Sequence, residues 1–373
     1  MMNDIKEIYI CSGSYHLFQS IYIAQHSENE KVLVYLSPIE RDIPVEIFSD
    51  YFDKIIYKKR FIYRERFGRK EPIFAIRMLK NCIRAGRLFP FTRIGRECYD
   101  RKKKYRTYVF DDYVLEANRI IQAVKNKKDS IILVEEGLMT YSTNQYALSN
   151  KRNHLSDLVT GVKSVPLVSH NPAIDTIMCK HPEKLPEIKA AGRKVIKIGN
   201  MFQDHEWVST MINLIDLKVP SLPDNCFVWL GQPLVEVGLD EEDEVKRIDG
   251  ILNLFDTECQ FIVKPHPREK SDKYNKLEDE KNVQLLDMGD QFWVPAELIF
   301  QKLKPRIVLT AYSSAADFLV ETNKDVYIIY CAMVMGIELD EDSIGALKGE
   351  NRFYPQTMTE LKEIIACIQC GRK

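Results

Sequence analysis

Short apolar segments alternate with helical patterns along this chain of 373 residues, and this alternation limits the fold more than any other feature. Such a pattern is typical of parallel sheets built from strand–helix–strand units. In the first part of the chain, strands are predicted at residues 7–11, 31–36, 54–57, 107–110, 130–134 and 195–198, and helices at 17–25, 74–87 and 114–126. In the second part, strands are predicted at residues 226–230, 260–263, 283–286, 306–309 and 325–330, and helices at 242–255, 294–302, 314–322 and 358–368. The sequence therefore predicts an α/β protein with two Rossmann-like lobes that face each other across a central cleft.

A proline-bearing connection, KVPSLPDN at residues 218–225, separates the two parts. The chain is long enough for two domains, each with its own core. We therefore assign residues 1–217 to a first lobe and residues 218–373 to a second lobe. The terminal helix could pack on the second lobe or return to the first.

The composition is that of a soluble globular protein, with 45% hydrophobic and 29% charged residues. No stretch approaches the run of about eighteen apolar residues that spans a membrane, and the first residues lack the apolar centre of a signal peptide. We therefore expect a cytoplasmic protein. The nine cysteines follow no disulfide framework, which favours reduced core thiols.

The net charge of −1 conceals a strongly basic segment between Lys58 and Arg106. Basic clusters favour anionic partners, which include nucleic acids, acidic glycans and anionic membrane surfaces. No recognisable nucleic-acid motif accompanies the segment, so we do not expect a nucleic-acid partner. A solvated helical face is the commonest explanation of such a cluster, and contact with a membrane or an anionic substrate is the next.

The segment Gln260-Phe-Ile-Val-Lys-Pro-His-Pro267 is a buried type of strand that stops at a histidine between two prolines. Each proline fixes its own φ and biases the preceding residue toward extended conformations, so Lys264 and His266 are held at the carboxyl end of the strand. Open α/β sheets bind their ligands there. His266 can donate a proton near neutral pH, and Lys264 can counter an anion. The alternative is a rigid turn with an exposed histidine, as expected for His181-Pro182, which follows no predicted strand.

A second predicted strand, residues 130–134, ends at Glu135-Glu136-Gly137. Gly137 can take a positive φ, so the chain can turn sharply and leave a carboxylate exposed. Because side chains alternate along a strand, only one of the two glutamates should face the cleft. That carboxylate suits general-base action on a hydroxyl, whereas the alternative is an ordinary polar strand end.

A third predicted strand ends at serines that begin a helix. Serine hydroxyls and the backbone N–H groups of a helix start can bind a phosphate or carboxylate, although helix capping alone also explains serines there. Two further strand ends carry small or polar turns that let a substrate approach the backbone closely. The candidate residues of these three turns are Tyr312, Ser313 and Ser314, Gly231 and Gln232, and Gly13 and Ser14.

The sequence has no dinucleotide-binding fingerprint, no phosphate-binding P-loop and no zinc-protease motif. Its only D-x-D, Asp340-Glu341-Asp342, lies in an acidic polar stretch and gives weak support for a metal–diphosphate site. A transferase whose donor leaves as a monophosphate needs no metal, since a histidine and a serine-lined helix start can stabilise the leaving group instead.

The order of these motifs, a carboxylate pair with glycine, then K-P-H-P, then Y-S-S, resembles that of the bacterial sialyltransferases. The opening strand, the L-G-Q-P-L run and the K-P-H-P turn are most similar to glycosyltransferase family 52, which includes lipooligosaccharide and capsule sialyltransferases. The resemblance extends from Ile8 to about Phe318. It implies a GT-B fold, with the acceptor on the first lobe and the nucleotide donor on the second.

The resemblance also implies an inverting, metal-independent reaction with CMP-N-acetylneuraminic acid as the donor. The acceptor would be a galactose-type sugar on a capsular polysaccharide or lipooligosaccharide precursor. His266 would protonate or hydrogen-bond the departing CMP phosphate, with Lys264, Ser313 and Ser314 in support, and Pro267 would be a further substrate-binding residue. Glu135 or Glu136 would take the proton of the acceptor hydroxyl, and the acidic run at residues 240–244 is the competing source of this base.

Two other functions remain open from the sequence. The chain could be a GT-B transferase of another sugar nucleotide, such as one that carries glucose, or a non-catalytic protein that binds sugar nucleotides. The resemblance further suggests a lipid-linked acceptor, peripheral contact of the basic segment with the inner face of a bacterial membrane, and a homodimer.

Overall fold

The computed structural model describes residues 5–37, 43–59, 98–112, 114–143, 168–220, 226–255, 260–270, 272–280, 283–303, 305–322 and 324–370. The chain divides into two compact units. Unit 1 is Met1–Thr140 with Ala147–Gly199, and unit 2 is Tyr141–Tyr146 with Asn200–Lys373. The main passage from one unit to the other follows Gly199, earlier in the chain than the prolines at 218–225 suggested.

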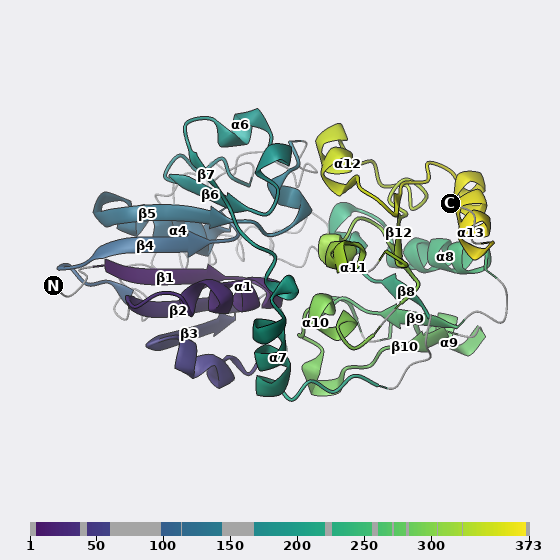
Figure 1. Ribbon diagram of the computed structural model, residues 1–373, viewed down its shortest axis with the longest axis horizontal. Helices are drawn as coiled ribbons and strands as arrows, with labels where there is room; N and C mark the ends of the chain where they lie inside the picture. The colour runs from purple at the N-terminus through teal and green to yellow at the C-terminus, as the bar shows by residue number, and fades with distance from the viewer. Residues whose placement is uncertain are drawn as a thin grey trace, which may run out of the picture. The chain divides into compact units, whose positions relative to one another are not determined.

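Unit 1 contains a parallel sheet of seven strands in the order β3-β2-β1-β4-β5-β6-β7 (Figure 1). Its strands are β1 (Ile5–Cys11), β2 (Glu30–Ser37), β3 (Lys54–Lys59), β4 (Lys104–Val109), β5 (Lys128–Val134), β6 (Thr176–Cys179) and β7 (Lys194–Lys197). Helices α1 (Ser14–Ala24), α4 (Leu115–Val124) and α6 (Glu187–Ala190) connect them, with short 3-10 turns η1 (Val45–Tyr51), η2 (Lys125–Lys127), η3 (Leu138–Thr140) and η4 (Pro182–Lys184). The central β1 is buried on both faces, as expected of a parallel strand covered by helices.

The strand order of unit 1 reverses between β1 and β4, because the chain moves outward from β1 to β3 and then returns to the other side of β1. Ligands of open α/β sheets bind at such a switch point, outside the carboxyl ends of the strands. The turns after β1 and β4 therefore border the expected ligand edge of unit 1.

Unit 2 contains a parallel sheet of six strands in the order β10-β9-β8-β11-β12-β13. Its strands are β8 (Phe227–Leu230), β9 (Phe261–Lys264), β10 (Val283–Leu285), β11 (Ile307–Thr310), β12 (Tyr327–Tyr330) and β13 (Arg352–Phe353). Its helices are α7 (His205–Leu214), α8 (Glu241–Leu252), α9 (Asn275–Glu280), α10 (Ala296–Phe300), α11 (Asp317–Thr322), α12 (Glu341–Leu347) and α13 (Met358–Gln369), with 3-10 turns η5 (Met201–Gln203), η6 (Leu234–Val237), η7 (Gly289–Gln291) and η8 (Ser314–Ala316). The switch point of this sheet lies between β8 and β11.

The terminal helix α13 belongs to the core of unit 2. Its residues Leu361, Ile365 and Ile368 are buried in one apolar cluster with Ile248 and Ile251 of α8, and Figure 1 shows the two helices side by side. The sequence left open whether this helix packs on the first lobe. The structure shows its apolar residues in the core of unit 2.

The prediction of an α/β protein with two parallel, Rossmann-like sheets is confirmed. Each predicted strand is present with small shifts at its ends, and the sequence missed the short strands β6 and β13. One correction follows from β6, because His181-Pro182 does follow a strand. The predicted helix at 74–87 and most of the basic segment from Lys58 to Arg106 lie outside the described residues.

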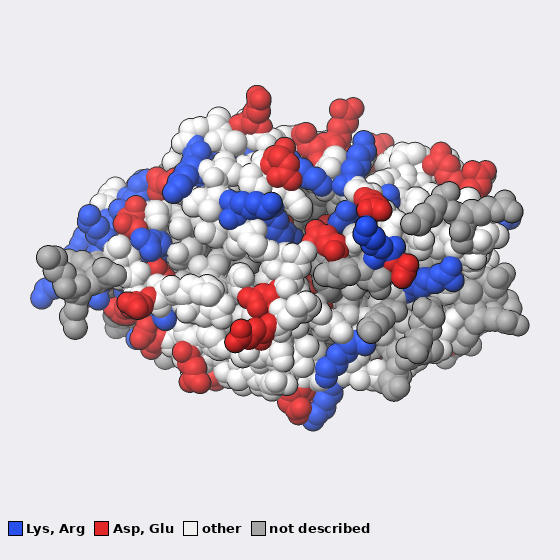
Figure 2. All heavy atoms as spheres, viewed as in Figure 1, with Lys and Arg blue, Asp and Glu red and all other residues white. Residues whose placement is uncertain are grey.

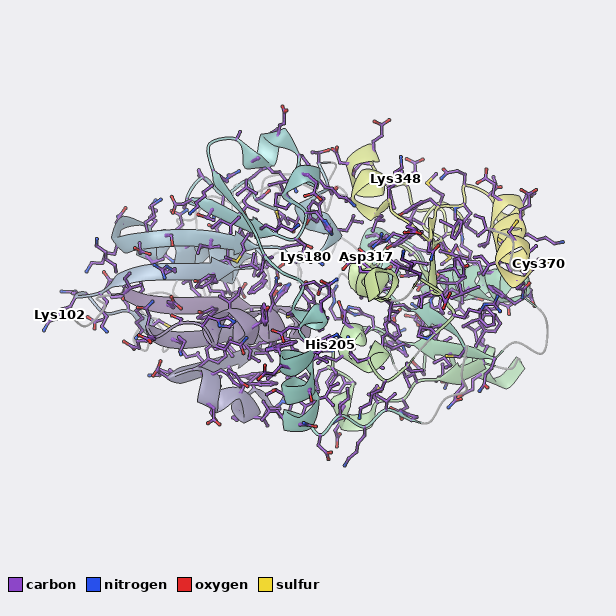
Figure 3. All side chains as sticks on the ribbon, in the orientation of Figure 1. Lys102, Lys180, His205, Asp317, Lys348 and Cys370 are labelled. Carbon is purple, nitrogen blue, oxygen red and sulfur yellow. The ribbon has the colours of Figure 1, made fainter. Side chains whose placement is uncertain are left out.

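No helix in the described part of the chain is long and apolar enough to cross a bilayer. The seven described cysteines form no disulfide with one another. Five of them are buried, whereas Cys367 and Cys370 are exposed near the end of α13, where Figure 3 labels Cys370. On the face drawn in Figure 2, acidic and basic side chains are interspersed, as expected of a chain with a net charge of −1.

Candidate functional site

The turn after β9 holds His266 through three hydrogen bonds with Arg268 and Glu269. The His266 backbone N–H donates to Glu269 Oε2 at 2.6 Å, and the Glu269 backbone N–H donates to the His266 carbonyl at 2.9 Å. The Arg268 backbone N–H donates to the imidazole Nδ1 at 3.1 Å. Both the backbone and the ring of His266 are therefore fixed by the turn that the two prolines begin.

The same contacts define the protonation of the His266 ring. Because Nδ1 accepts a hydrogen bond, the neutral ring carries its proton on Nε2. Burial, together with the nearby charges of Arg268, Lys264 and Lys273, holds the pKa of His266 well below its usual value. His266 is therefore a neutral imidazole near pH 7, and among the described residues no group accepts a hydrogen bond from Nε2–H.

Lys264 ends β9 with a buried side chain, and its Nζ donates to the Pro265 carbonyl at 3.3 Å. Burial lowers the pKa of Lys264 to about 8, although the carboxylates of Glu297 and Glu269 act in the opposite direction. The ammonium group is therefore charged at neutral pH and loses its proton in mildly alkaline solution.

The turn after β8 connects the two neighbouring strand ends. The Gly231 N–H donates to the Lys264 carbonyl at 2.9 Å. The Gln232 side-chain oxygen accepts from Thr310 Oγ1 at 3.1 Å and from the Tyr312 N–H at 2.8 Å. Gln232 thus holds the start of the turn that leads to the two serines.

The two serines of that turn begin the 3-10 turn η8. Ser313 is its N-cap, and the Ser313 hydroxyl accepts from the Ala315 N–H at 3.3 Å. Ser314 is the first residue of η8, and the predicted helix at 314–322 is divided into η8 and α11. Helix capping therefore explains Ser313. The hydroxyl hydrogen of Ser313 and the hydroxyl of Ser314 are further hydrogen-bond donors in this turn.

The structure brings the predicted donor-side residues to one edge of the unit 2 sheet. The turns that carry His266, Gly231 and Ser313 follow β9, β8 and β11, and β8 pairs in parallel with both neighbours. Neighbouring strands lie about 4.8 Å apart, so β9 and β11 are about 10 Å apart across β8. A ligand of nucleotide size would be needed to contact His266 and the serines together.

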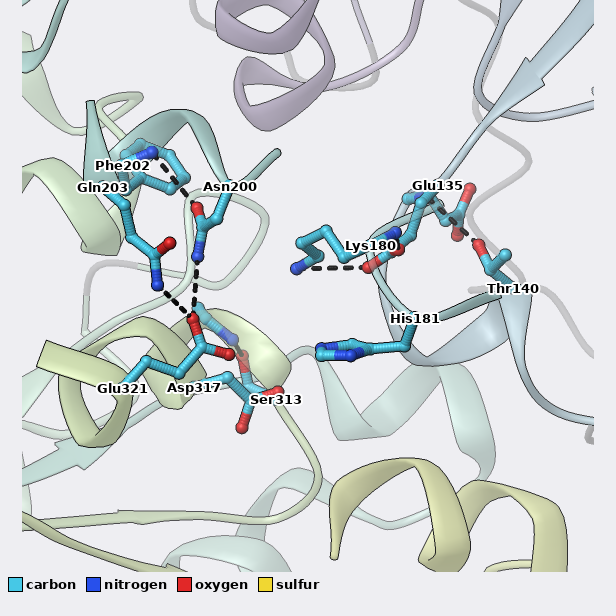
Figure 4. A network of polar contacts seen from close by, with 12 residues as sticks. Glu135, Thr140, Lys180, His181, Asn200, Phe202, Gln203, Ser313, Asp317 and Glu321 are labelled. Atoms are coloured by element: carbon cyan, nitrogen blue, oxygen red, sulfur yellow. Dashed lines mark hydrogen bonds and ion pairs between the residues drawn. The ribbon is translucent and has the colours of Figure 1, made fainter. Parts of the chain in front are cut away.

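In unit 1 the two glutamates after β5 differ in burial and in their hydrogen-bond partners. Glu135 is buried, its Oε2 accepts from the Lys180 backbone N–H at 2.6 Å, and its Oε1 lies 3.1 Å from Lys180 Nζ (Figure 4). Glu135 therefore holds the end of β6 against the end of β5. The Glu136 backbone N–H donates to Thr140 Oγ1 at 3.2 Å, and the next residue, Gly137, has the positive φ of 130° that the sharp turn requires.

The Glu136 carboxylate lies in a cluster with His16 and Asp111, in which one ligand atom of each residue is within 4.8 Å of the others. His16 Nδ1 is 3.8 Å from Asp111 Oδ2 and accepts from the Ser12 backbone N–H at 3.3 Å, and its ring stacks on Phe110 at 4.7 Å. These residues follow β1, β4 and β5, so the cluster borders the switch point of unit 1.

The sequence predictions missed His16 and Asp111. Asp111-Asp112 directly follows a predicted strand, which was the available signal. Gly13 and Ser14, which were predicted, form the N-cap and the first residue of α1, the helix that carries His16.

Asp112 has a structural role instead. It is fully buried and accepts from the backbone N–H groups of Ser169 at 2.9 Å and Asn171 at 3.1 Å, while burial raises its pKa to about 6. Of the two neighbouring aspartates, only Asp111 therefore faces the cluster.

Within the described part of the chain, His16, Asp111 and Glu136 are the residues whose donor atoms are close enough to share a cation. The Ser12 N–H already occupies Nδ1 of His16, which does not favour a metal there. Asp340, the first residue of the D-x-D, is the N-cap of α12 and accepts from the Ser142 hydroxyl at 2.6 Å. Asp340 therefore has a structural role as a helix cap.

The acidic run at 240–244 forms the start of α8. Asp240 is the N-cap and accepts from the Glu242 N–H at 2.9 Å, and the buried Glu244 is paired with the buried Lys273. Burial raises the pKa of Glu244 to about 7, although Lys273 acts against this. We therefore expect Glu244 to take no part in the chemistry.

A family model described as alpha-2,8-polysialyltransferase (POLYST) matches residues 7–316. A protein of Haemophilus influenzae described as uncharacterized is 26% identical over 208 residues, which are 54% of this chain and 63% of that protein. The chain thus spans less than two thirds of the curated relative that it matches.

Among solved structures, a UDP-GlcNAc 2-epimerase from Neisseria meningitidis bound to UDP-GlcNAc has a TM-score of 0.58 at 12% identity, covering 97% of this chain and 91% of its own. The epimerase of Methanocaldococcus jannaschii, in complex with UDP-GlcNAc and UDP, has a TM-score of 0.56 at 13% identity, covering 98% and 92%. These likenesses concern the fold, and they confirm the predicted GT-B type of architecture.

Proposed function

Because the chain belongs to the alpha-2,8-polysialyltransferase family, as the match over residues 7–316 establishes, we propose that it is an inverting, metal-independent sialyltransferase. The donor is CMP-N-acetylneuraminic acid. The acceptor is a hydroxyl of a surface glycan, either on a galactose-type sugar or, as the family description suggests, on a terminal sialic acid. The observation that carries the proposal is the neutral His266, fixed at the switch-point edge of unit 2 with Nε2 as its donor.

On the donor side, the bond between the anomeric carbon and the CMP phosphate breaks, and its electron pair leaves with the phosphate. His266 Nε2–H donates a hydrogen bond to the departing oxygen, and Lys264 contributes its positive charge. The hydroxyls of Ser313 and Ser314 contact the same phosphate. Such preorganised donors stabilise charge that develops in the transition state and contribute about 10²–10³-fold to the rate for each donor.

On the acceptor side, Glu136 takes the proton of the attacking hydroxyl. The oxygen of that hydroxyl bonds to the anomeric carbon on the face opposite the departing phosphate, which inverts the configuration. Glu136 is favoured over Glu135 because Glu135 is buried and bound to Lys180.

Donor competition tests this proposal. The purified protein is incubated in EDTA with a sialylated or galactose-terminated oligosaccharide and with either CMP-sialic acid or UDP-glucose. We expect transfer from CMP-sialic acid alone, and EDTA should not reduce it. Transfer from UDP-glucose alone would instead establish the other sugar-nucleotide reaction, and a requirement for added metal would contradict the metal-independent mechanism.

The donor KM should depend on pH through Lys264. The pKa of Lys264 is lowered to about 8, so its positive charge is present below this pH and is lost above it. We therefore expect the KM for CMP-sialic acid to rise as the pH increases from 7 to 9, because the anionic donor loses a cationic partner. Lys264→Arg stays charged throughout this range, so the rise in KM should be smaller in this variant.

The basic segment between Lys58 and Arg106 lies mostly outside the described residues. We propose that this segment holds a cytoplasmic enzyme near anionic lipid, where lipid-linked acceptors are found. We therefore expect the protein to sediment with vesicles that contain anionic lipid.

We also propose the homodimer that the family resemblance suggests. Sedimentation equilibrium without lipid should then give twice the mass of one chain.

A further inference from the structure

A buried polar network lies next to the His266 turn. Lys273 is paired with the carboxylates of both Glu269 and Glu244, and the Tyr274 hydroxyl donates to Glu269 Oε1 at 2.9 Å. The side chains of the three charged residues are at most 2% exposed. Burying charges is costly unless they are paired and hydrogen-bonded, so this network needs a reason to be retained.

Among the four described residues of this network, Glu269 is the one that is hydrogen-bonded to His266. The two oxygens of Glu269 have different partners, since Oε1 receives Lys273 and Tyr274, while Oε2 receives the His266 backbone N–H at 2.6 Å. Glu244 shares the same Lys273 but has no hydrogen bond to the His266 turn among the described residues. The two carboxylates therefore resemble each other in burial and in their cationic partner, and differ in their contact with the proposed site.

The neighbouring turn after β8 confirms how tightly the Glu269 carboxylate is placed. A Cβ atom on Gly231 would lie 2.5 Å from Glu269 Oε2, 2.8 Å from the Tyr274 hydroxyl and 3.1 Å from the Lys264 carbonyl. Glycine is therefore needed at position 231, because the backbone there passes directly over the carboxylate. The carboxylate is held between the two turns that carry Gly231 and His266.

We infer that Glu269 is a positioning residue for His266: its buried carboxylate, held by Lys273 and Tyr274, fixes the turn so that Nε2–H of the ring is directed at the donor. The inference rests on the proposed role of His266. It also accounts for the buried charges, because a carboxylate forms a stronger hydrogen bond to a backbone N–H than a neutral acceptor does.

Two alanine variants form a matched pair that tests the inference. Glu269→Ala and Glu244→Ala each remove one of the two carboxylates on Lys273, so both should lower the melting temperature. Only Glu269→Ala should lower kcat, by about 10²-fold, because misplacing a reacting group by about 1 Å costs a factor of this size. The KM for the donor should change little, since the phosphate partners Lys264 and Ser314 remain.

A conservative variant separates positioning from loss of the fold. The amide oxygen of Glu269→Gln can still accept the His266 N–H, although more weakly than a carboxylate, so this variant should recover part of the kcat that Glu269→Ala loses. Equal loss of kcat in Glu269→Ala and Glu244→Ala, or no recovery in Glu269→Gln, would overturn the inference.

Nitrogen-15 NMR gives a readout that needs no transfer activity. The wild-type His266 ring, assigned from the spectrum of His266→Ala, should show the Nε2–H tautomer, because Nδ1 accepts the Arg268 N–H. Glu269→Ala should lose this single tautomer, and Glu244→Ala should keep it. An unchanged tautomer in Glu269→Ala would contradict the inference, whereas a wild-type protein without transfer from CMP-sialic acid would contradict only the proposed function.

Discussion

Replacing His266 with alanine should lower kcat for transfer from CMP-sialic acid by about 10²–10³-fold, the usual effect of removing one preorganised donor from developing negative charge. The backbone of the turn should persist, because the His266 N–H and carbonyl still bond to Glu269. His205→Ala is the control, since His205 is the exposed first residue of α7 (Figure 3). Steady-state kinetics of both variants checks the result, and equal activity of the two would remove His266 from the mechanism.

The pH dependence of the wild-type enzyme distinguishes two roles for the same ring. A histidine that acts as a charged acid loses activity as the pH rises through its ordinary pKa of about 6.5. The pKa of His266 is held well below that value, so a neutral donor predicts no fall in kcat at this point. A decline in wild-type kcat near pH 6.5 that His266→Ala lacks would restore the role of a charged acid.

The same lowered pKa affects stability. Below pH 6.5 the unfolded chain binds a proton at His266 that the folded chain does not bind, so this residue makes the folded state less stable as the pH falls. Above pH 6.5 the ring is neutral in both states and has no such effect. As the pH falls below 6.5, the free energy of unfolding should therefore decrease more in the wild type than in His266→Ala.

Substitutions of the two glutamates after β5 should have different effects, one on kcat and the other on the free energy of unfolding. Glu136→Gln should lower kcat by about 10²–10⁴-fold, the usual contribution of a general base, with little loss of stability. Glu135→Gln should lower the free energy of unfolding by about 1–3 kcal/mol, because the partly buried Lys180 loses the charge of its buried partner. Activity per folded molecule should change little in Glu135→Gln. Kinetics and denaturant unfolding of both variants measure the two effects.

The opposite pattern, with Glu135→Gln inactive and Glu136→Gln active, would move the base to Glu135. Asp111→Asn is the third variant in this comparison, because Asp111 belongs to the same cluster as Glu136. Loss of activity in Asp111→Asn with full activity in Glu136→Gln would assign the proton to Asp111. Activity in all three variants would place the base elsewhere in the chain.

Much of the fold was predictable because buried parallel strands appear as short apolar runs, and every predicted strand is present. The donor-side turns were predictable for a related reason, since they directly follow such strands. The choice between Glu135 and Glu136 was not, because it depends on Lys180, which follows the missed four-residue strand β6.

His16 and Asp111 were missed because their proximity depends on strand order. The residues are far apart in the sequence, and they meet only because β4 pairs directly with β1. Hydrophobic periodicity and short sequence motifs do not specify which strands pair. The position of α13 has a similar origin, since its apolar face fits either lobe until the core of unit 2 is known.

Two aspartates each hold residues that are distant in the sequence. The Ser142 hydroxyl is bound to Asp340, the cap of α12, and the backbone N–H groups of Ser169 and Asn171 are bound to Asp112. Directed evolution of this protein should therefore leave Asp112 and Asp340 unchanged, because replacing either would release residues that lie 57 or more positions away in the chain.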